Sequence, residues 1–211
     1  MTASSKPRRS PKPQERQRDP ERTRRLILEA AVAEFAAHGF AGARIAAIAA
    51  RAGVNQQLIS YYFDGKDGLY QAISEGWGRR ETELADPGTP LSEQLRRYVL
   101  EVLSSRDGMR LMAWSGLEYG GPDTDPDHAR RSASLGGTVD QVAELQKAGK
   151  LPDWVDPACL TVMLMAAAMA PVTLPHVIEG LARTDPGEPE FVKHYADQLA
   201  RLIEHLNPEQ R

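Results

Sequence analysis

The sequence of 211 residues has a single cysteine and only 6% aromatic residues. One thiol cannot form an internal disulfide, and the paired cysteines of a structural zinc site are missing, so the fold must be held by an apolar core. We expect the single cysteine, Cys159, to be a small buried core residue. A lone thiol is also typical of a reducing compartment, and cytoplasmic is the location we expect.

The sequence also lacks a long apolar run. The longest, Val162–Val172, contains Pro171 and is much shorter than the roughly 20 residues that a membrane-spanning helix needs. The N-terminus is basic but has no apolar segment of the kind found in secretory signals. We therefore expect neither a membrane span nor export.

Catalytic and metal-binding motifs are missing as well. There is no Gly-x-Ser-x-Gly sequence and no phosphate-binding Gly-Lys-Ser/Thr loop. The five histidines show no metal-ligand spacing; they are His38, His128, His176, His194 and His205. We considered an enzyme as a rival class of function, and these absences disfavour it. We expect no catalytic residues, metal or cofactor.

Charge is unevenly distributed along the chain. Up to Lys66 there are 12 lysines and arginines against 6 aspartates and glutamates, a charge of +6, whereas the remainder has 14 against 23, a charge of −9. Basic residues gain free energy next to DNA by releasing condensed counterions. The N-terminal third is therefore a candidate for binding nucleic acid, and the acidic remainder is not.

Sustained β-branched alternation is absent, and apolar residues recur at helical spacing, so we predict an all-α protein of about nine helices. Residues 1–20 are rich in proline, serine and basic residues and are predicted to form a disordered arm, either a DNA contact or only a solvated tail. Pro171 and Pro175 should interrupt or kink the penultimate helix. The helices are expected at 22–38, 44–52, 55–62, 66–83, 91–105, 108–118, 126–147, 157–181 and 190–206.

The second and third predicted helices form a tight corner. Gly53 can adopt a positive φ in the turn, and Asn55 can cap the third helix by accepting a backbone N–H bond. Ile45, Ile48, Ala49, Val54, Ile59 and Phe63 supply an apolar seam between the two helices.

The residues left to project from this corner are uncharged hydrogen-bonding groups. Gln56, Gln57 and Ser60 suit base edges in the major groove, since amides bond adenine bidentately. Asn55 and Tyr61 project beside them, and Tyr61, Tyr62 and Lys66 would more naturally contact phosphates. Taken alone, the pattern also fits a solvent-facing polar helix of an ordinary bundle.

Residues 23–70 resemble the DNA-binding domain of the TetR-type (TetR/AcrR) transcriptional repressors. The resemblance implies an N-terminal three-helix helix-turn-helix domain at 21–68, followed by a larger helical ligand-binding and dimerisation domain at 69–211. Where the family has serine or threonine, this chain has Ala43-Arg44, so Arg44 is a candidate replacement for the usual phosphate contact. The matching motifs are Ile27-Leu28-Glu29-Ala30-Ala31, Phe35, Gly39-Phe40, Ile48-Ala49, Ala52-Gly53-Val54 and Tyr61-Tyr62-Phe63-Asp64-Gly65-Lys66-Asp67-Gly68-Leu69-Tyr70.

The resemblance also implies a homodimer, formed by the last two long helices, that binds a pseudo-palindromic operator in double-stranded DNA. A core stripe within a monomer is the alternative for the same residues. The expected interface residues are Leu160, Leu164, Ala167, Phe191, Tyr195, Leu199 and Leu202.

Members of the resembled family release DNA when a small molecule binds the second domain. Methionine and aromatic side chains suit an adaptable apolar pocket, although such residues also serve simply as core. The effector is not identified by the sequence, and a helical protein-interaction module without DNA binding is the alternative function. The candidate pocket residues are Met109, Met112, Trp114, Tyr119, Met163 and Met165.

Overall fold

The structure, a computed structural model, describes residues 13–84, 88–125 and 127–206. These residues form ten α-helices and one 3₁₀ helix, with no strand among them, which confirms the all-α prediction. The elements are α1 (Pro13–Gly42), α2 (Ile45–Ala52), α3 (Gln56–Phe63), α4 (Gly65–Leu84), α5 (Leu91–Ser104), α6 (Arg106–Leu117), η1 (Pro122–Thr124), α7 (His128–Lys147), α8 (Pro157–Thr173), α9 (Pro175–Ala182) and α10 (Pro189–Leu206).

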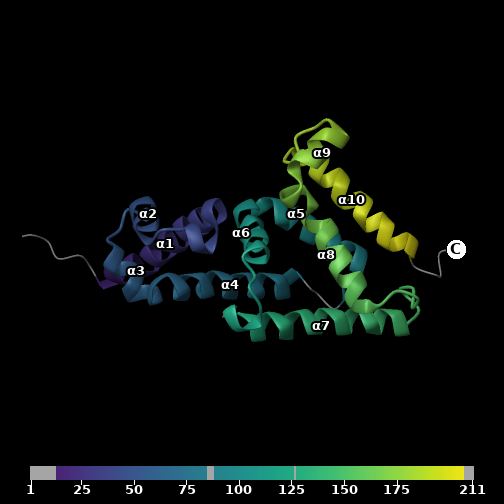
Figure 1. Ribbon diagram of the computed structural model, residues 1–211, viewed down its shortest axis with the longest axis horizontal. Helices are drawn as coiled ribbons and strands as arrows, with labels where there is room; N and C mark the ends of the chain where they lie inside the picture. Colours follow the sequence, from purple (N-terminus) through teal and green to yellow (C-terminus); the bar gives the residue numbers. More distant parts are fainter. Residues whose placement is uncertain (1–12, 85–87, 126, 207–211) are drawn as a thin grey trace, which may run out of the picture.

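The helices are arranged as a small head and a larger body (Figure 1). Helices α1 to α3 gather at one end of the long axis, and α5 and α7 to α10 lie at the other. Helix α4 runs from the head towards the body, and α6 packs against α1. The head is therefore joined to the body by both the chain and a packed helix.

Helix α1 differs from the prediction at its start. It begins at Pro13 and contains Pro20, so the disorder expected up to Pro20 is wrong for residues 13–20. Residues 1–12 of the expected arm lie outside the described residues. The predicted stop near Gly39 does correspond to a break, because Gly39 has a non-helical φ of 69° and ψ of 177°.

Two apolar cores stabilise the molecule. The first joins α1, α2 and α3 to Leu69 and Ile73 of α4 and Leu111 of α6. It therefore extends beyond the boundary predicted at residues 68–69, which falls inside α4. The second core lies in the body and contains Leu95, Val99, Val142, Leu151, Leu160, Leu164, Ala168, Ala196, Leu199 and Ile203.

The penultimate helix is divided, which accounts for ten helices where about nine were expected. Helices α8 and α9 meet at Leu174 at an angle of 82°, so the break precedes Pro175, whereas Pro171 lies inside α8. Proline has no N–H to donate to the carbonyl four residues earlier. In this chain that carbonyl, of Ala167, accepts a bond of 2.6 Å from the Tyr195 hydroxyl of α10.

Helix α6 begins at Arg106 and not at residue 108 as predicted, so the expected gap between the helices at residues 106 and 107 is wrong. Gly108 is a buried residue of the helix. A Cβ at this position would lie 2.8 Å from the ring of Trp77. This glycine therefore leaves room for the Trp77 side chain of α4 against α6, which explains its presence without a turn.

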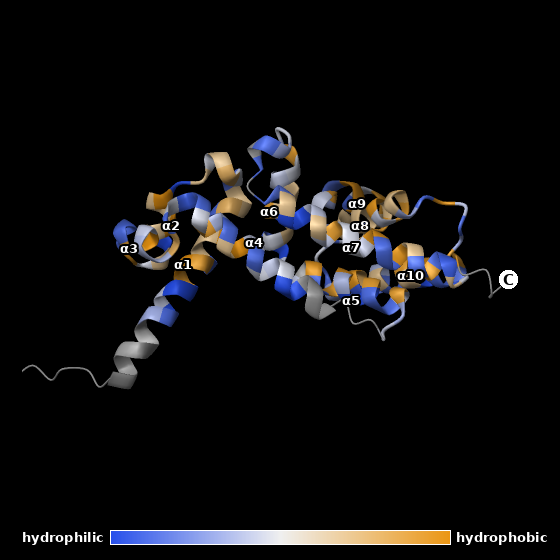
Figure 2. Ribbon diagram, turned by 90° about the horizontal axis from the view of Figure 1, so that it is seen from below, coloured by the Kyte–Doolittle hydropathy of each residue, from blue (hydrophilic) through white to orange (hydrophobic). Residues whose placement is uncertain are grey.

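Helix α10 is amphipathic, and the described helices were also compared with the length and hydropathy of a membrane span. In Figure 2, α10 carries alternating apolar and polar stripes, as an amphipathic helix should. Among the described helices, none is individually long and apolar enough to cross a membrane. The bent pair α8 and α9 passes the same test as a combined segment.

Candidate nucleic-acid interface

The turn between α2 and α3 has the geometry of a helix-turn-helix corner. Gly53 adopts a left-handed conformation, with φ 68° and ψ 33°, which is open to glycine at little cost. The Val54 N–H donates to the Ala49 carbonyl at 3.0 Å, and the Asn55 side-chain oxygen accepts the Gln57 N–H at 3.0 Å. The predicted cap of the third helix is thereby confirmed.

A buried apolar seam holds the two helices together. Ile48 and Ala49 of α2 and Ile59 and Phe63 of α3 are all buried in the first core. Of the other seam residues, Ile45 and Val54 are half-buried against the same core. Because one side of α3 is fixed to α2 in this way, the opposite side of α3 faces outward.

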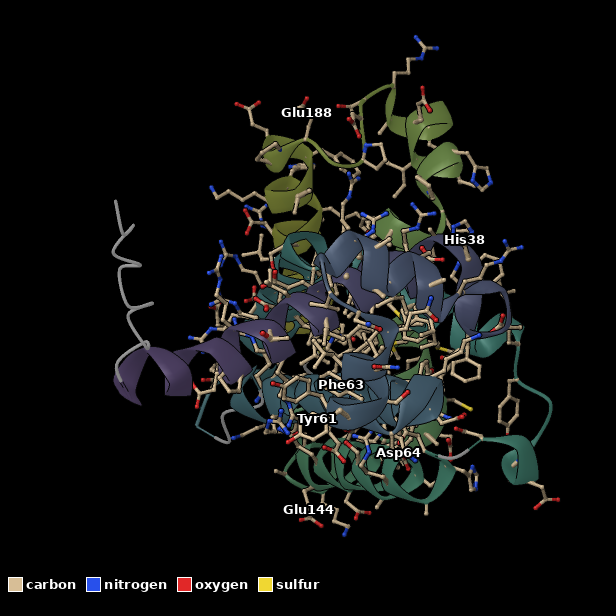
Figure 3. The ribbon with its side chains drawn as sticks, turned by 90° about the vertical axis from the view of Figure 1, so that its left-hand side faces the viewer. His38, Tyr61, Phe63, Asp64, Glu144 and Glu188 are labelled. Carbon is tan, nitrogen blue, oxygen red and sulfur yellow. The ribbon has the colours of Figure 1, made fainter. Side chains whose placement is uncertain are left out.

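The outward face of α3 carries four hydrogen-bonding side chains, with Leu58 36% exposed among them. Gln56, Gln57 and Ser60 are exposed, and 79% of Tyr61 is exposed. Figure 3 views this end of the molecule and labels Tyr61 together with the buried Phe63. Amides and hydroxyls on an exposed helix face are the groups that read base edges in a major groove.

The two adjacent tyrosines occupy different environments. Tyr62 is half-buried and packs against the first core, with its ring centroid 6.4 Å from that of Phe63. Tyr61 meets it edge to face, at 5.1 Å between centroids, and projects into solvent. Of the pair, Tyr61 presents more surface to a ligand of the head.

Lys66 interacts with its own chain. Its ammonium donates to the Ala41 carbonyl at 3.3 Å and lies 4.7 Å from the centroid of the Phe40 ring. An ammonium carries three donors, so a phosphate contact there would be additional to a role in holding the connection between α1 and α2. The sequence pattern predicts only the phosphate contact.

The start of α2 is capped from outside the helix. Arg44 has the extended N-cap conformation, but its side chain makes no capping bond, and the first turn of α2 contains no acidic residue. The Glu34 carboxylate of α1, which is only 6% exposed, accepts the Arg44 backbone N–H at 3.3 Å. The Arg44 side chain itself is exposed.

Two residues at this interface are missed by the motif-based prediction. Glu34 follows Ile27 and Ala30 on the apolar face of α1, and a carboxylate at such a position is a usable signal of a buried polar contact. The Arg24 guanidinium lies 5.1 Å from the centroid of the Phe63 ring. It therefore brings a cation to the α3 side of the head, in line with the charge asymmetry of the sequence.

Residues of α6 and just beyond it form hydrogen bonds with the end of α1. The Glu118 carboxylate, just beyond α6, accepts the N–H groups of Phe40 at 3.0 Å and Ala41 at 3.2 Å. The Trp114 indole N–H donates to the Ala36 carbonyl at 3.1 Å. These bonds satisfy backbone groups that the break at Gly39 frees from α1.

The predicted pocket residues do not surround either of two surface depressions found on the body. One, of about 630 Å³, is lined by residues of α9 and the following loop, including His176, Arg183 and Asp185. The other, of about 290 Å³, lies between α5 and α10. Of the six predicted residues, Trp114 bonds to α1, and Tyr119 and Met163 are exposed, whereas Met109, Met112 and Met165 are half-buried.

Burial and a hydrogen bond shift the pKa values of three side chains on α4, α5 and α10. Burial raises the pKa of Tyr195, whose hydroxyl bonds to α8. Burial also raises the pKa of Tyr70 in α4. A hydrogen bond from Arg80 of α4 lowers the pKa of Glu101 in α5, with 2.8 Å between the Arg80 Nε and Glu101 Oε1 atoms.

The predicted interface residues lie mostly on the inner faces of α8 and α10. Leu160, Leu164 and Leu199 are buried in the core of their own chain, as the alternative of a core stripe within a monomer predicts. Ala167 and Tyr195 pack against that core, and Phe191 is half-buried. Of the predicted set, Leu202 is the residue that is largely exposed, at 56%.

The outer faces of the same two helices nevertheless expose apolar side chains. Val162 and Met163 of α8 are 66% and 60% exposed. Cys159 is exposed on α8 as well, which contradicts its prediction as a core residue. Helix α8 is apolar on all sides, so its sequence pattern does not distinguish the inner face from the outer one.

Comparison with known proteins agrees with this arrangement. The model of bacterial regulatory proteins of the tetR family matches residues 27–73, and the tetracyclin repressor-like C-terminal domain matches residues 91–201. The chain is 35% identical over 164 residues to the HTH-type transcriptional repressor SCO4008 of Streptomyces coelicolor, covering 76% of this chain and 83% of that protein. It is 29% identical to the repressor NicS of Pseudomonas putida, over 71% and 74% of the two chains.

A solved structure of a similar protein extends the match to three dimensions. The transcriptional regulator SCO4942 of Streptomyces coelicolor superposes with a TM-score of 0.71 and 27% identity, over 88% of this chain and 98% of that one. Both halves of the chain, the capped helix-turn-helix and the helical body, are thus matched. The chain belongs to the TetR family and is a DNA-binding transcriptional regulator.

Proposed function

We propose that this chain represses transcription by binding a pseudo-palindromic operator as a homodimer, with α3 of each subunit in a major groove, until a small-molecule effector releases it. The observation that supports this most is the exposed amide and hydroxyl face of α3, carried on a helix that Asn55 caps and the buried seam fixes. Because such an operator lies on bacterial DNA, the cytoplasm is the proposed place of action.

Selection of bound sequences from a random duplex pool tests the operator model. A pseudo-palindromic motif with half-sites about one helical turn apart is expected for a symmetric dimer. A selected motif without two-fold symmetry would contradict it. A salt-independent interaction would instead point to a protein-binding module, since phosphate contacts release counterions and depend on salt.

Base-reading and phosphate-contacting residues can be told apart by comparing affinity for the operator with affinity for random duplex DNA. We expect Gln57→Ala to relax base preference at one position of each half-site, with a loss of about 1–3 kcal/mol for a bidentate contact. Lys66→Ala should weaken binding to operator and random duplex by the same factor, because phosphates carry no sequence information. Equal losses on both duplexes for Gln57→Ala would remove it from the readers.

Arg44 is proposed to contact a phosphate through its exposed guanidinium. Arg44→Ala should then lower the dependence of affinity on salt by about one phosphate contact. Measuring affinity at several salt concentrations gives this slope directly. An unchanged dependence of affinity on salt would show that the Arg44 side chain contacts no phosphate.

The dimer is proposed to form through the outer faces of α8 and α10, where Val162, Met163 and Leu202 are exposed. A charge in an apolar interface has no partner and is strongly unfavourable there. We expect Met163→Glu to yield monomers in sedimentation experiments. The control Ser134→Glu, at an exposed position of α7, should leave the mass unchanged.

Effector release is proposed to pass through the contact of Glu118 with the end of α1. A library compound that raises the melting temperature of the protein should also weaken operator binding, if it binds the DNA-free state more tightly than the DNA-bound state. In the Glu118→Ala protein the same compound should still bind but release DNA less. Compounds that bind and release DNA equally from both proteins would exclude this route.

A further inference from the structure

The first turn of α2 lacks the usual means of capping a helix. In a capping box, a serine or threonine at the N-cap bonds the backbone of the first turn, and a glutamate three residues later accepts the N-cap N–H. Here those positions hold Arg44 and Ala47. Arg44 makes no side-chain cap, and the first turn has no acidic residue.

A carboxylate from another helix occupies the place of that missing glutamate. Glu34 of α1 accepts the Arg44 N–H at 3.3 Å, which is the bond that the third residue of a capping box normally makes. On the other side of Arg44, its carbonyl accepts the N–H groups of Ala47 at 3.0 Å and Ile48 at 3.1 Å. The N-cap residue is thus held at both its N–H and its carbonyl.

The position of Glu34 in the core makes this contact consequential. The residue is 6% exposed and lies on the face of α1 that also buries Ala30, Ala31 and Phe35. A carboxylate in such a place is costly unless it is hydrogen-bonded, and the positive end of a helix dipole stabilises a negative charge. The start of α2 supplies both the donor and the dipole.

We propose that Glu34 is a positioning residue for the DNA-binding surface, which caps α2 from α1 and fixes the backbone of Arg44 so that its guanidinium faces the DNA. This inference rests on the proposed function of the head. The fixed α2 is the support against which α3 packs, through Ile48 and Ala49. Glu34 therefore acts on DNA binding without touching DNA.

A double-mutant cycle tests the role. Arg44→Ser places a hydroxyl at the N-cap, which can cap α2 from within the helix. In the natural background, Glu34→Leu should lower affinity for a duplex selected by the wild-type protein about two- to thirtyfold, the equivalent of losing one helix cap. In the Arg44→Ser background, the same change should lower it less than twofold, since about one cap is then restored.

Matched controls separate this role from general damage. Glu29→Leu removes an exposed carboxylate of α1, whose partner Arg25 lies at 3.6 Å, and should leave affinity within about twofold, as expected for a surface ion pair. Glu34→Gln keeps an oxygen that can accept the Arg44 N–H, so it should retain more affinity than Glu34→Leu. Circular dichroism establishes that each variant is folded.

The results distinguish failure of the inference from failure of the proposed function. Equal losses for Glu34→Leu in the two backgrounds, or no loss in the natural one, would overturn the role of Glu34 while DNA binding stands. A wild-type protein that selects no duplex would overturn the proposed function itself. If Glu34→Leu does not fold, hydrogen exchange of the Arg44 amide is measured in Glu34→Gln. Retained protection of this amide supports the capping role of Glu34. Exchange of this amide as fast as in Glu34→Ala overturns that role.

Discussion

Replacing Gly68 by alanine should displace α4 from the end of α3. Gly68 lies in the first turn of α4, directly beside the carbonyl of Phe63 that ends α3. A Cβ built on Gly68 would overlap the Phe63 carbonyl oxygen and lie 2.9 Å from its carbon. Both atoms are backbone, so no change of rotamer relieves the overlap, and the two helices must separate.

The size of the effect follows from two opposing contributions. Overpacking costs about 1–3 kcal/mol, whereas alanine gains up to about 1 kcal/mol over glycine in a helix interior. We therefore expect Gly68→Ala to lower the free energy of unfolding by about 1–2 kcal/mol. Operator affinity should fall by about five- to thirtyfold if binding must restore the position of α3, since 1.4 kcal/mol corresponds to a factor of ten.

The matched control is Gly76→Ala, in the same helix. A Cβ there would have as its nearest neighbour the mobile end of Arg79, at 3.9 Å, so this change should be neutral or stabilising by up to about 1 kcal/mol. Denaturant unfolding and titration with the selected operator measure both variants. If Gly68→Ala unfolds at the same midpoint as Gly76→Ala, the close approach of α4 to α3 is wrong.

Three further predictions concern the body and its junction with the head. Tyr195→Phe leaves the Ala167 carbonyl unsatisfied and should cost about 1–2 kcal/mol of stability in denaturant unfolding. The loss should be smaller in a Pro171→Ala background, because alanine restores the helical N–H. The control Tyr119→Phe, at an exposed tyrosine, should have no effect. Arg80 lowers the pKa of Glu101, so this pair contributes stability above the ordinary carboxyl pKa and loses it as pH falls through the lowered value. Glu101→Gln should therefore reduce the acid-induced loss of stability, by no more than about 1 kcal/mol for a partly exposed pair. Identical loss of stability on acidification in Glu101→Gln and the wild type would show that the pair does not contribute. Gly39→Ala should destabilise the end of α1, because its φ of 69° disfavours a side chain and the Cβ would meet Glu118 and Trp114; thermal unfolding indistinguishable from that of Gly42→Ala would contradict this.

The helix-turn-helix could be predicted because its signals are local. Gly53 permits the turn, and Asn55 caps a helix two residues later, so each acts within a few positions of the chain. The exposed Gln57 and the seam residue Ile59 are two positions apart, which places them about 200° apart around a helix, on opposite faces. A pattern that depends on neighbours in sequence is readable without the tertiary structure.

Features that depend on tertiary partners were not predictable in the same way. Glu34 acts on Arg44, ten residues away in another helix, and no short motif links them. Gly108 resembles a turn signal, yet the ring of Trp77 explains it. In both cases the residue type depends on its packing partner, and that partner is not part of the neighbouring sequence.

Helix α8 shows a third limit, in which the pattern carries too little contrast. Its residues are apolar on every side, so the pattern that suggests a partner interface at Leu160 and Leu164 fits their burial in the core of the chain equally well. Helix α10 is amphipathic (Figure 2), and Leu199 of its apolar stripe is buried in the core of its own chain. A stripe marks a buried face, and burial within the chain satisfies that pattern as well as burial by a partner.

The connection between α1 and α2 is held by three hydrogen-bonding side chains from other elements of the chain. Glu118 from beyond α6 holds the N–H groups at its start, Lys66 from α4 holds the Ala41 carbonyl, and Glu34 from α1 holds the Arg44 N–H. These contacts are directional bonds to backbone, which weaken steeply when a partner moves by an ångström, whereas apolar packing tolerates small shifts by repacking. A movement of α6 or α4 would therefore reach α2 through this connection first, while the seam between α2 and α3 keeps the corner intact. The head would then change its position relative to the body as a unit, without losing its internal geometry.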